Sequence, residues 1–195
     1  MSRIGDLFLF RKHHVCPRWL CFTFDNWFRR RIQNPEQIIK PYIREGDTVV
    51  DVGPGIGFFT LPMARLVGDK GQVIAVDIQE KMLTAIAQRA LHEGVAHRIR
   101  TQLASQSSLN ITAEADFILA FWMAHEVPDQ ERFLTQLHTV LKNKGQFLLA
   151  EPKLHVSKVQ FETLLGKAQK VGFRLLNRPN IPLSLAALFV KLKTD

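Results

Sequence analysis

The stretch Val49–Thr60, VVDVGPGIGFFT, constrains the fold more than any other part of this chain. An apolar run with the composition of a short buried strand leads into a turn with glycines at Gly53, Gly55 and Gly57, and a segment of helical character begins at Phe58. A glycine turn between a strand and a helix is typical of nucleotide-binding folds. A Cβ at these positions would block both the tight turn and the close approach of a ligand to the backbone.

The spacing of the glycines and two nearby acids restrict the ligand. The glycines follow the pattern G-x-G-x-G, whereas dinucleotide-binding turns have G-x-G-x-x-G. Asp51 lies two residues before the first glycine, where a carboxylate would repel a pyrophosphate but suits a ligand with an ammonium and a sulfonium group. Asp77 ends a second apolar run, twenty residues after Gly57, and is placed to accept both hydroxyls of a ribose.

This combination resembles the first two motifs of the class I S-adenosylmethionine (SAM) methyltransferases. Leu141–Glu151, LKNKGQFLLAE, is similar to the LKPGG-type turn into the fifth strand of that group, with Asn143 and Lys144 where Pro and Gly are more usual. Ala124–Asp129, AHEVPD, is similar to the HHVPD stretch after strand four in the ubiquinone/menaquinone C-methyltransferase-like (type 11) branch, with Glu126 in place of the second histidine.

Two further segments are similar to a small prokaryotic set of methyltransferases without a settled substrate. Asp25–Arg30 resembles the DNPxRR-like segment of that set, and Glu151–Lys158 resembles its EPKxHVSK stretch. The HEVPD sequence is shared as well. This closer resemblance therefore implies the fold and the methyl donor but names no acceptor.

The rest of the chain predicts alternating strands and helices. Apolar runs typical of buried strands alternate with segments of helical spacing. The loop with Pro179 and Pro182 is too short for a crossover helix, so the last strand should pair antiparallel. We expect strands at about 48–52, 72–76, 99–103, 116–121, 146–150, 173–177 and 185–192, helices at about 57–67, 79–93, 128–141 and 157–171, and a stop at 142–145.

Two regions are predicted. Residues 41–195 resemble the class I methyltransferase fold, which is an α/β, Rossmann-like, doubly wound seven-stranded sheet with helices on both faces and the last strand antiparallel. Residues 1–40 are aromatic and basic at their start and do not fit the alternation. We expect them to form a cap over the carboxyl ends of the strands, with a helix that begins at Asn34 and Pro35.

The resemblance implies SAM as the methyl donor and S-adenosylhomocysteine as its product. Asp77 should accept the ribose diol, and Asp51 should order the glycine loop near the methionine ammonium group. The adenine is expected against Ile78 and against Ser105 and Gln106, where many members of the group have an acid. The residues expected to contact SAM, the last two beside its sulfonium, are Asp51, Gly53, Pro54, Gly55, Gly57, Phe58, Asp77, Ile78, Met82, Ser105, Gln106, Ala120 and Phe121.

Three residues near the ends of strands four and five are candidates for acid–base chemistry or acceptor contact. His125 follows strand four, and an imidazole with an ordinary pKa near 6.5 can accept a proton; a structural His bonded to a carbonyl is the alternative. Glu126 is a candidate to orient His125 or to bind a cationic acceptor, or it caps a helix start. Glu151 is expected to point into the same crevice, unless it pairs with Lys153 or an arginine of the cap.

The formal net charge of +8 suggests an anionic partner, such as nucleic acid, anionic lipid or an acidic small molecule. Part of the excess is local, because residues 1–45 carry nine Lys or Arg and four acids. Asn26, Arg29 and Arg30 are candidates to clamp an acidic group of the acceptor, since Arg presents a planar fork to carboxylate or phosphate. A solvated basic turn is the alternative.

A small-molecule acceptor is the preferred prediction, and three alternatives stay open. An RNA methyltransferase would use the basic N-terminal face, although the chain lacks N/D-P-P-Y after strand four and a Pro-Cys nucleophile for cytosine carbon methylation. A SAM-binding accessory protein without turnover would share the same cofactor site. A NAD-dependent dehydrogenase is disfavoured by the glycine spacing.

The cysteine and hydrophobicity patterns bear on metal binding and location. Two cysteines do not make a disulfide framework, and the spacing of His13, His14, Cys16 and Cys21 fits no zinc pattern, so no metal is expected. The start of the chain lacks the apolar run of a signal peptide, and no run reaches the roughly 18–20 residues that span a bilayer. We expect a cytoplasmic protein without a membrane span; the oligomeric state is not indicated.

Overall fold

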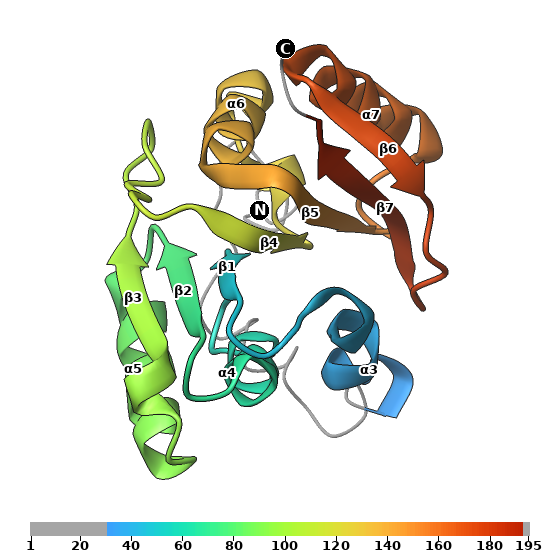
Figure 1. The fold of residues 1–195 in the computed structure, drawn as a ribbon. Helices are drawn as coiled ribbons and strands as arrows, with labels where there is room; N and C mark the ends of the chain where they lie inside the picture. The colour runs from blue at the N-terminus through green and yellow to red at the C-terminus, as the bar shows by residue number, and fades with distance from the viewer. Residues whose placement is uncertain (1–30, 193–195) are drawn as a thin grey trace, which may run out of the picture.

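A seven-stranded sheet organises the protein and brings the glycine turn to its centre. The computed structural model describes residues 31–192. The strands pair in the order β3-β2-β1-β4-β5-β7-β6 (Figure 1); β7 runs antiparallel to both of its neighbours, β5 and β6, and the other described pairs are parallel. They are β1 Thr48–Val52, β2 Gln72–Asp77, β3 Ile99–Leu103, β4 Ala115–Phe121, β5 Leu141–Pro152, β6 Phe173–Asn177 and β7 Ser184–Lys191.

Helices cover both faces of the sheet, which confirms the predicted α/β, doubly wound fold with an antiparallel last strand. In Figure 1, α6 and α7 lie on one face, and α3, α4 and α5 lie on the other. Each face has its own cluster of buried apolar side chains. The helices are α3 Pro35–Ile39, α4 Thr60–Val67, α5 Glu80–His92, α6 Gln130–Val140 and α7 Lys158–Val171, with short 3-10 helices η2 Lys40–Tyr42, η3 Ala96–Arg98 and η4 Ala124–Glu126.

Signals at the helix ends act as the sequence suggests. Asn34 caps α3, because its Oδ1 accepts a hydrogen bond from the Gln37 amide at 3.2 Å. Ser157 and Gln160 form a capping box at the start of α7. Gly172 ends α7 with φ +112, a left-handed conformation that glycine adopts without strain.

The helix ends before residues 142–145, as predicted, but the predicted start of the fifth strand at residue 146 is wrong, because residues 142–145 already belong to β5. Leu141 is fully buried and pairs with Ala115, directly after the last residue of α6. The register then shifts, and regular pairing resumes between Gln146 and Phe117. Residues 142–145 form an irregular, bulged part of the strand because burial of Leu141 begins the pairing earlier than the polar sequence indicates.

Residues 104–114 join β3 to β4 without a helix. Leu109, Ile111 and Ala113 pack against the core cluster on the α6 and α7 face, so the loop itself covers part of that face. Within the described range, no helix is both long and apolar enough to cross a membrane.

Candidate active site

Three glycines shape the turn between β1 and α4, with φ +67 at Gly53, +56 at Gly55 and +92 at Gly57. Residues with side chains rarely adopt this left-handed backbone, and for this reason α4 begins at Thr60 and not at Gly57 as predicted. A Cβ on Gly53 would lie 2.8 Å from Cγ of Met123, so the turn packs against the segment that follows β4. A Cβ on Gly55 would meet nothing within 4 Å. The turn therefore has an open side, where a ligand can approach the backbone.

Asp51 on β1 is nearly fully buried, with 1% of its surface exposed. The hydroxyl of Thr60, the first residue of α4, donates a hydrogen bond to Oδ2 of Asp51 at 2.6 Å. Burial raises the pKa of Asp51 to about 7; the hydrogen bond from Thr60 opposes this rise, and the charge of Asp77 adds to it. The carboxyl group thus ties β1 to the first turn of α4 and supplies negative charge at the turn when it ionises.

Asp77 ends β2 and is also largely buried, with 8% exposed. Its Oδ1 accepts a hydrogen bond from the Gln79 amide at 2.8 Å. Burial raises the pKa of Asp77 to about 6, the amides of Gln79 and Ile78 oppose the rise, and the charge of Glu126 adds to it. Because β1 and β2 are parallel neighbours, Asp77 and the glycine turn lie at the same edge of the sheet.

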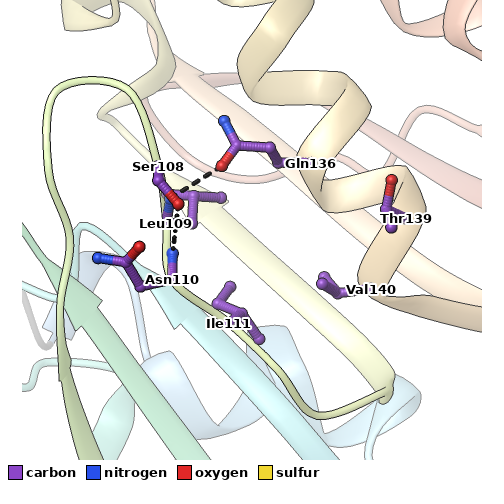
Figure 2. A pocket seen from close by; sticks show the side chains of 7 residues that line it. All are labelled: Ser108, Leu109, Asn110, Ile111, Gln136, Thr139 and Val140. Atoms are coloured by element: carbon purple, nitrogen blue, oxygen red, sulfur yellow. Dashed lines mark hydrogen bonds between the residues drawn. The ribbon is translucent and has the colours of Figure 1, made fainter.

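The loop after β3 is fastened to α6 (Figure 2). Oε1 of Gln136 accepts a hydrogen bond from the Leu109 amide at 2.9 Å, and the Ser105 hydroxyl accepts one from the Ser108 amide at 3.0 Å. Ser105 and Gln106 are both exposed, close to the carboxyl end of β3. A cavity of about 160 Å³ lies between this loop and α6, lined by Ser108, Leu109, Asn110, Ile111, Gln136, Thr139 and Val140, and no predicted site residue lines it.

His125 in η4 and Glu151 near the end of β5 form a hydrogen-bonded pair between Nδ1 and Oε2. Glu151 is fully buried, and its Oε1 has no hydrogen-bond partner among the described residues. Burial disfavours the charged imidazolium of His125, but the hydrogen bond to Glu151 and the charges of Glu151 and Glu126 outweigh it, and the pKa of His125 is raised above its ordinary 6.5. The structure thus brings together the three residues predicted for acid–base chemistry.

The other predicted site residues differ in accessibility. Ile78 is 41% exposed, next to Asp77. Five of these residues are buried and can form only the walls of the candidate site, namely Pro54, Phe58, Met82, Ala120 and Phe121. Asn26, Arg29, Arg30, His13, His14, Cys16 and Cys21 lie outside the described residues. Within residues 31–192, no group of three or more His, Cys, Asp or Glu side chains is arranged to hold a metal ion.

Sequence reasoning missed Thr60 and Trp122. Thr60 lies nine residues after Asp51, in the first turn of the predicted helix 57–67. A hydroxyl group near the start of a helix can donate a hydrogen bond to an acid on the preceding strand, and this is the signal that could have identified Thr60. Trp122 follows β4, and its indole Nε1 donates a hydrogen bond to the hydroxyl of Ser184 at 2.9 Å. The two residues are 62 positions apart in the sequence, and no local pattern predicts their contact.

A comparison with protein families agrees with this arrangement. Residues 43–173 match a family profile described as a methyltransferase domain. The chain belongs to this methyltransferase-domain family. The matched segment includes the glycine turn, both buried aspartates and the pair of His125 and Glu151.

Curated relatives point to the same class. The chain is 29% identical over 147 residues to the ubiquinone/menaquinone biosynthesis C-methyltransferase UbiE of Marinomonas sp. (strain MWYL1), a match that covers 75% of this chain and 57% of the relative. It is 29% identical over 176 residues to the UbiE protein of Erwinia tasmaniensis, covering 90% of this chain and 62% of that one. The chain therefore spans little more than half the length of these relatives. The resemblance to class I SAM methyltransferases and their UbiE-like branch is confirmed; the similarity to the smaller prokaryotic set stays a prediction.

Solved structures share the fold. A SAM-dependent methyltransferase from Aquifex aeolicus aligns with a TM-score of 0.79 at 22% identity, over 91% of this chain and 100% of that protein. A candidate rRNA-methylase from Clostridium thermocellum aligns with a TM-score of 0.66 at 20% identity, over 83% of this chain and 96% of that protein. At these identities the likeness establishes the fold.

Proposed function

We propose that the protein transfers a methyl group from SAM to a small-molecule acceptor. The observation that carries the proposal is the largely buried carboxyl group of Asp77 at the same sheet edge as the open side of the glycine turn at Gly55. A carboxylate at this place accepts the paired hydroxyls of a ribose, and a backbone without a Cβ admits the rest of the ligand. Family membership supports SAM over a dinucleotide.

Methyl transfer from SAM requires the protein to align the two reactants and to exclude water, and the described residues include groups suited to both tasks. When bound, SAM supplies a methyl group on a positively charged sulfur that is already a good leaving group. The protein has mainly to align the donor with the acceptor and exclude water, an effect of roughly 7–11 kcal/mol. Asp51 and Thr60 fix the turn that would hold the amino-acid end of SAM, and Ala120 and Phe121 at the end of β4 are buried walls for its reactive part.

His125 is the candidate base that removes a proton from the acceptor. If Nδ1 carries the proton that is donated to Glu151, Nε2 keeps a lone pair for the acceptor. Glu151 then acts as a positioning residue, because it fixes the tautomer and the plane of the ring. Glu126, with its Oε1 4.0 Å from Nε2 of His125, is close enough to contact the acceptor or to stabilise the imidazolium.

The pH profile of methyl transfer should move when Glu151 is changed. Turnover by the wild type should rise with pH as His125 loses its proton, through a pKa above 6.5. Glu151→Gln removes the charge that raises this pKa, so the rising limb should shift to lower pH while the maximal rate falls about tenfold. The measurement is the initial rate of labelled methyl transfer between about pH 5 and pH 9. Glu131→Gln on the exposed side of α6 is the control. A rising limb at the same pH in Glu151→Gln and in wild type would contradict the role of Glu151 as the partner of His125.

Gln136→Leu is expected to weaken SAM binding about fivefold. The change removes the acceptor of the Leu109 amide, a hydrogen bond with a net contribution of roughly 1 kcal/mol, and loosens the loop that carries Ser105 and Gln106. Calorimetric titration with SAM measures the effect. Thr139→Val is the matched control, because Thr139 lines the same cavity but bonds within its own helix. Equal affinity of Gln136→Leu and wild type would show that the loop does not contact the adenine.

The N-terminal segment, residues 1–40, is proposed to cap the acceptor side. Its described part supports this: Gln33 is fully buried and donates from Nε2 to the carbonyl of Pro182 at 2.6 Å. Pro182 precedes β7, whose first residue Ser184 pairs with Pro152 at the carboxyl end of β5. A cytoplasmic location belongs to the same proposal, on the low number of cysteines.

An RNA acceptor is the second candidate. It is favoured by the net charge of +8 and by the shared fold of the candidate rRNA-methylase. RNA binding of this kind is driven by phosphate contacts and weakens steeply with salt.

Incubation with methyl-labelled SAM and fractionated cell extract tests the proposal. We expect label in the small-molecule pool. Label in the RNA pool alone would favour the second candidate. SAM binding without label in any pool would favour an accessory protein without turnover.

A further inference from the structure

Trp122 has a backbone conformation that tryptophan rarely adopts. It follows β4 directly and has φ +61, in the left-handed region where a Cβ clashes with the backbone and that residues other than glycine rarely adopt. Its amide donates a hydrogen bond to the carbonyl of Ala150 on β5 at 2.7 Å, which holds the strained backbone in place. Such strain persists only where the surroundings enforce it, and it occurs often at functional sites.

The indole ring is held as firmly as the backbone. Ser184 is buried, and its hydroxyl accepts from Nε1 of Trp122 at 2.9 Å and from Nε2 of Gln33 at 3.4 Å. The same hydroxyl donates to the carbonyl of Pro182 at 3.3 Å. A serine hydroxyl has one donor and two acceptor sites, so its hydrogen-bonding capacity is filled. Trp122 packs against the apolar cluster on the α3 and α4 face but is only partly buried as a whole residue.

Trp122 lies between the proposed sulfonium contact Phe121, whose ring centroid is 5.4 Å from that of Trp122, and the candidate base His125. The glycine turn and Asp77 lie at the ends of β1 and β2, whereas Trp122 follows β4, three residues before His125. Its partner Ser184 lies beside the end of β5. A methyl donor held by β1 and β2 leaves the ends of β4, β5 and β7 for the acceptor.

We propose that Trp122 is a specificity-determining residue against which the acceptor packs, and that Ser184 and Gln33 are positioning residues that fix the plane of its ring. The inference rests on the proposed function, because it assigns the acceptor half of that same site. A ring fixed at both the backbone and Nε1 presents one surface shape, so acceptors are selected by how well they fit it.

The test combines SAM calorimetry with labelled methyl transfer to the small-molecule fraction of cell extract. The variants are Trp122→Phe, which keeps an aromatic ring without the indole N–H, and Ser184→Ala; Thr163→Val, which loses a hydroxyl bonded within α7, is the control. We expect labelling at limiting extract to fall about tenfold in Trp122→Phe and about fivefold in Ser184→Ala. The loss should lie in KM for the extract fraction and not in kcat, with SAM affinity within about twofold of wild type.

Three results would overturn the proposal. Unchanged labelling in both variants, with normal SAM binding, would show that the acceptor does not contact Trp122. An equal loss of SAM affinity and labelling would show that the network only supports the fold. Absence of any heat when SAM is added to the wild type would instead remove the proposed function, and the role of Trp122 with it.

Discussion

Asp77→Ala is expected to weaken SAM binding at least about tenfold, because each hydrogen bond to a charged group contributes about 1.5–3 kcal/mol. Asp77 is largely buried at the end of β2, and its Oδ1 is oriented by the Gln79 amide. The substitution removes the proposed acceptor of the ribose hydroxyls but leaves the glycine turn in place. Calorimetric titration with SAM near neutral pH measures the effect, and a circular dichroism spectrum and melting curve confirm that the variant is folded.

Asp69→Ala is the matched control for Asp77→Ala. Asp69 is exposed in the turn before β2 and pairs with Arg98 at 2.5 Å, so its loss should leave SAM affinity within about twofold of wild type. The pKa of Asp77 near 6 adds a second test. Affinity in the wild type should fall as the pH drops below about 6 and the carboxylate becomes protonated. Equal affinities of Asp77→Ala and wild type would contradict the ribose role.

Asp51→Asn is expected to stabilise the ligand-free protein above neutral pH and to weaken SAM binding. Burial raises the pKa of Asp51 from 3.8 to about 7, so between these values the folded state holds a proton that the unfolded chain has released. Stability of the wild type therefore falls as the pH rises through this window. About three pKa units correspond to a destabilisation on the order of 4 kcal/mol above pH 7. An asparagine side chain carries no charge and so avoids this destabilisation, and its carbonyl oxygen can still accept the hydrogen bond from Thr60.

Urea unfolding without ligand, measured between about pH 4 and pH 8, tests this prediction. The stability of Asp51→Asn relative to wild type should increase across this range. Asp116→Asn is the control, since Asp116 is partly exposed and bonded to Lys142, and this variant should gain no stability as the pH rises. Parallel stability curves for Asp51→Asn and wild type would contradict the buried, proton-holding state of Asp51. SAM affinity equal to wild type would contradict its placement beside the ligand.

Local patterns were sufficient for the fold and for the position of the glycine turn and Asp77 at one edge of the sheet; their contact with SAM stays a prediction. The positive-φ glycines are a backbone requirement that the sequence displays directly, and Asp77 ends a strand whose apolar composition marks it. The short loop before β7 correctly predicted an antiparallel strand, because it has too few residues for a crossover helix. Each of these features depends on residues that are neighbours in the chain.

Features that depend on the pairing of distant segments were only partly predictable. His125 and Glu151 were both candidates, but their hydrogen bond follows from the register of β4 and β5, in which Phe121 lies opposite Ala150. The bulge in β5 follows from tertiary burial of Leu141, against a polar local sequence. The contact between Trp122 and Ser184 has no sequence signal, since it joins the end of β4 to the start of β7.

A crystal structure with S-adenosylhomocysteine would show whether the carboxyl edge of β1 and β2 holds the methyl donor. We expect both ribose hydroxyls within hydrogen-bonding distance of the Asp77 carboxylate and the amino-acid end against the glycine turn at Gly55. The same molecule bound elsewhere on the protein, with Asp77 making no contact to it, would show that this edge is not the methyl-donor site.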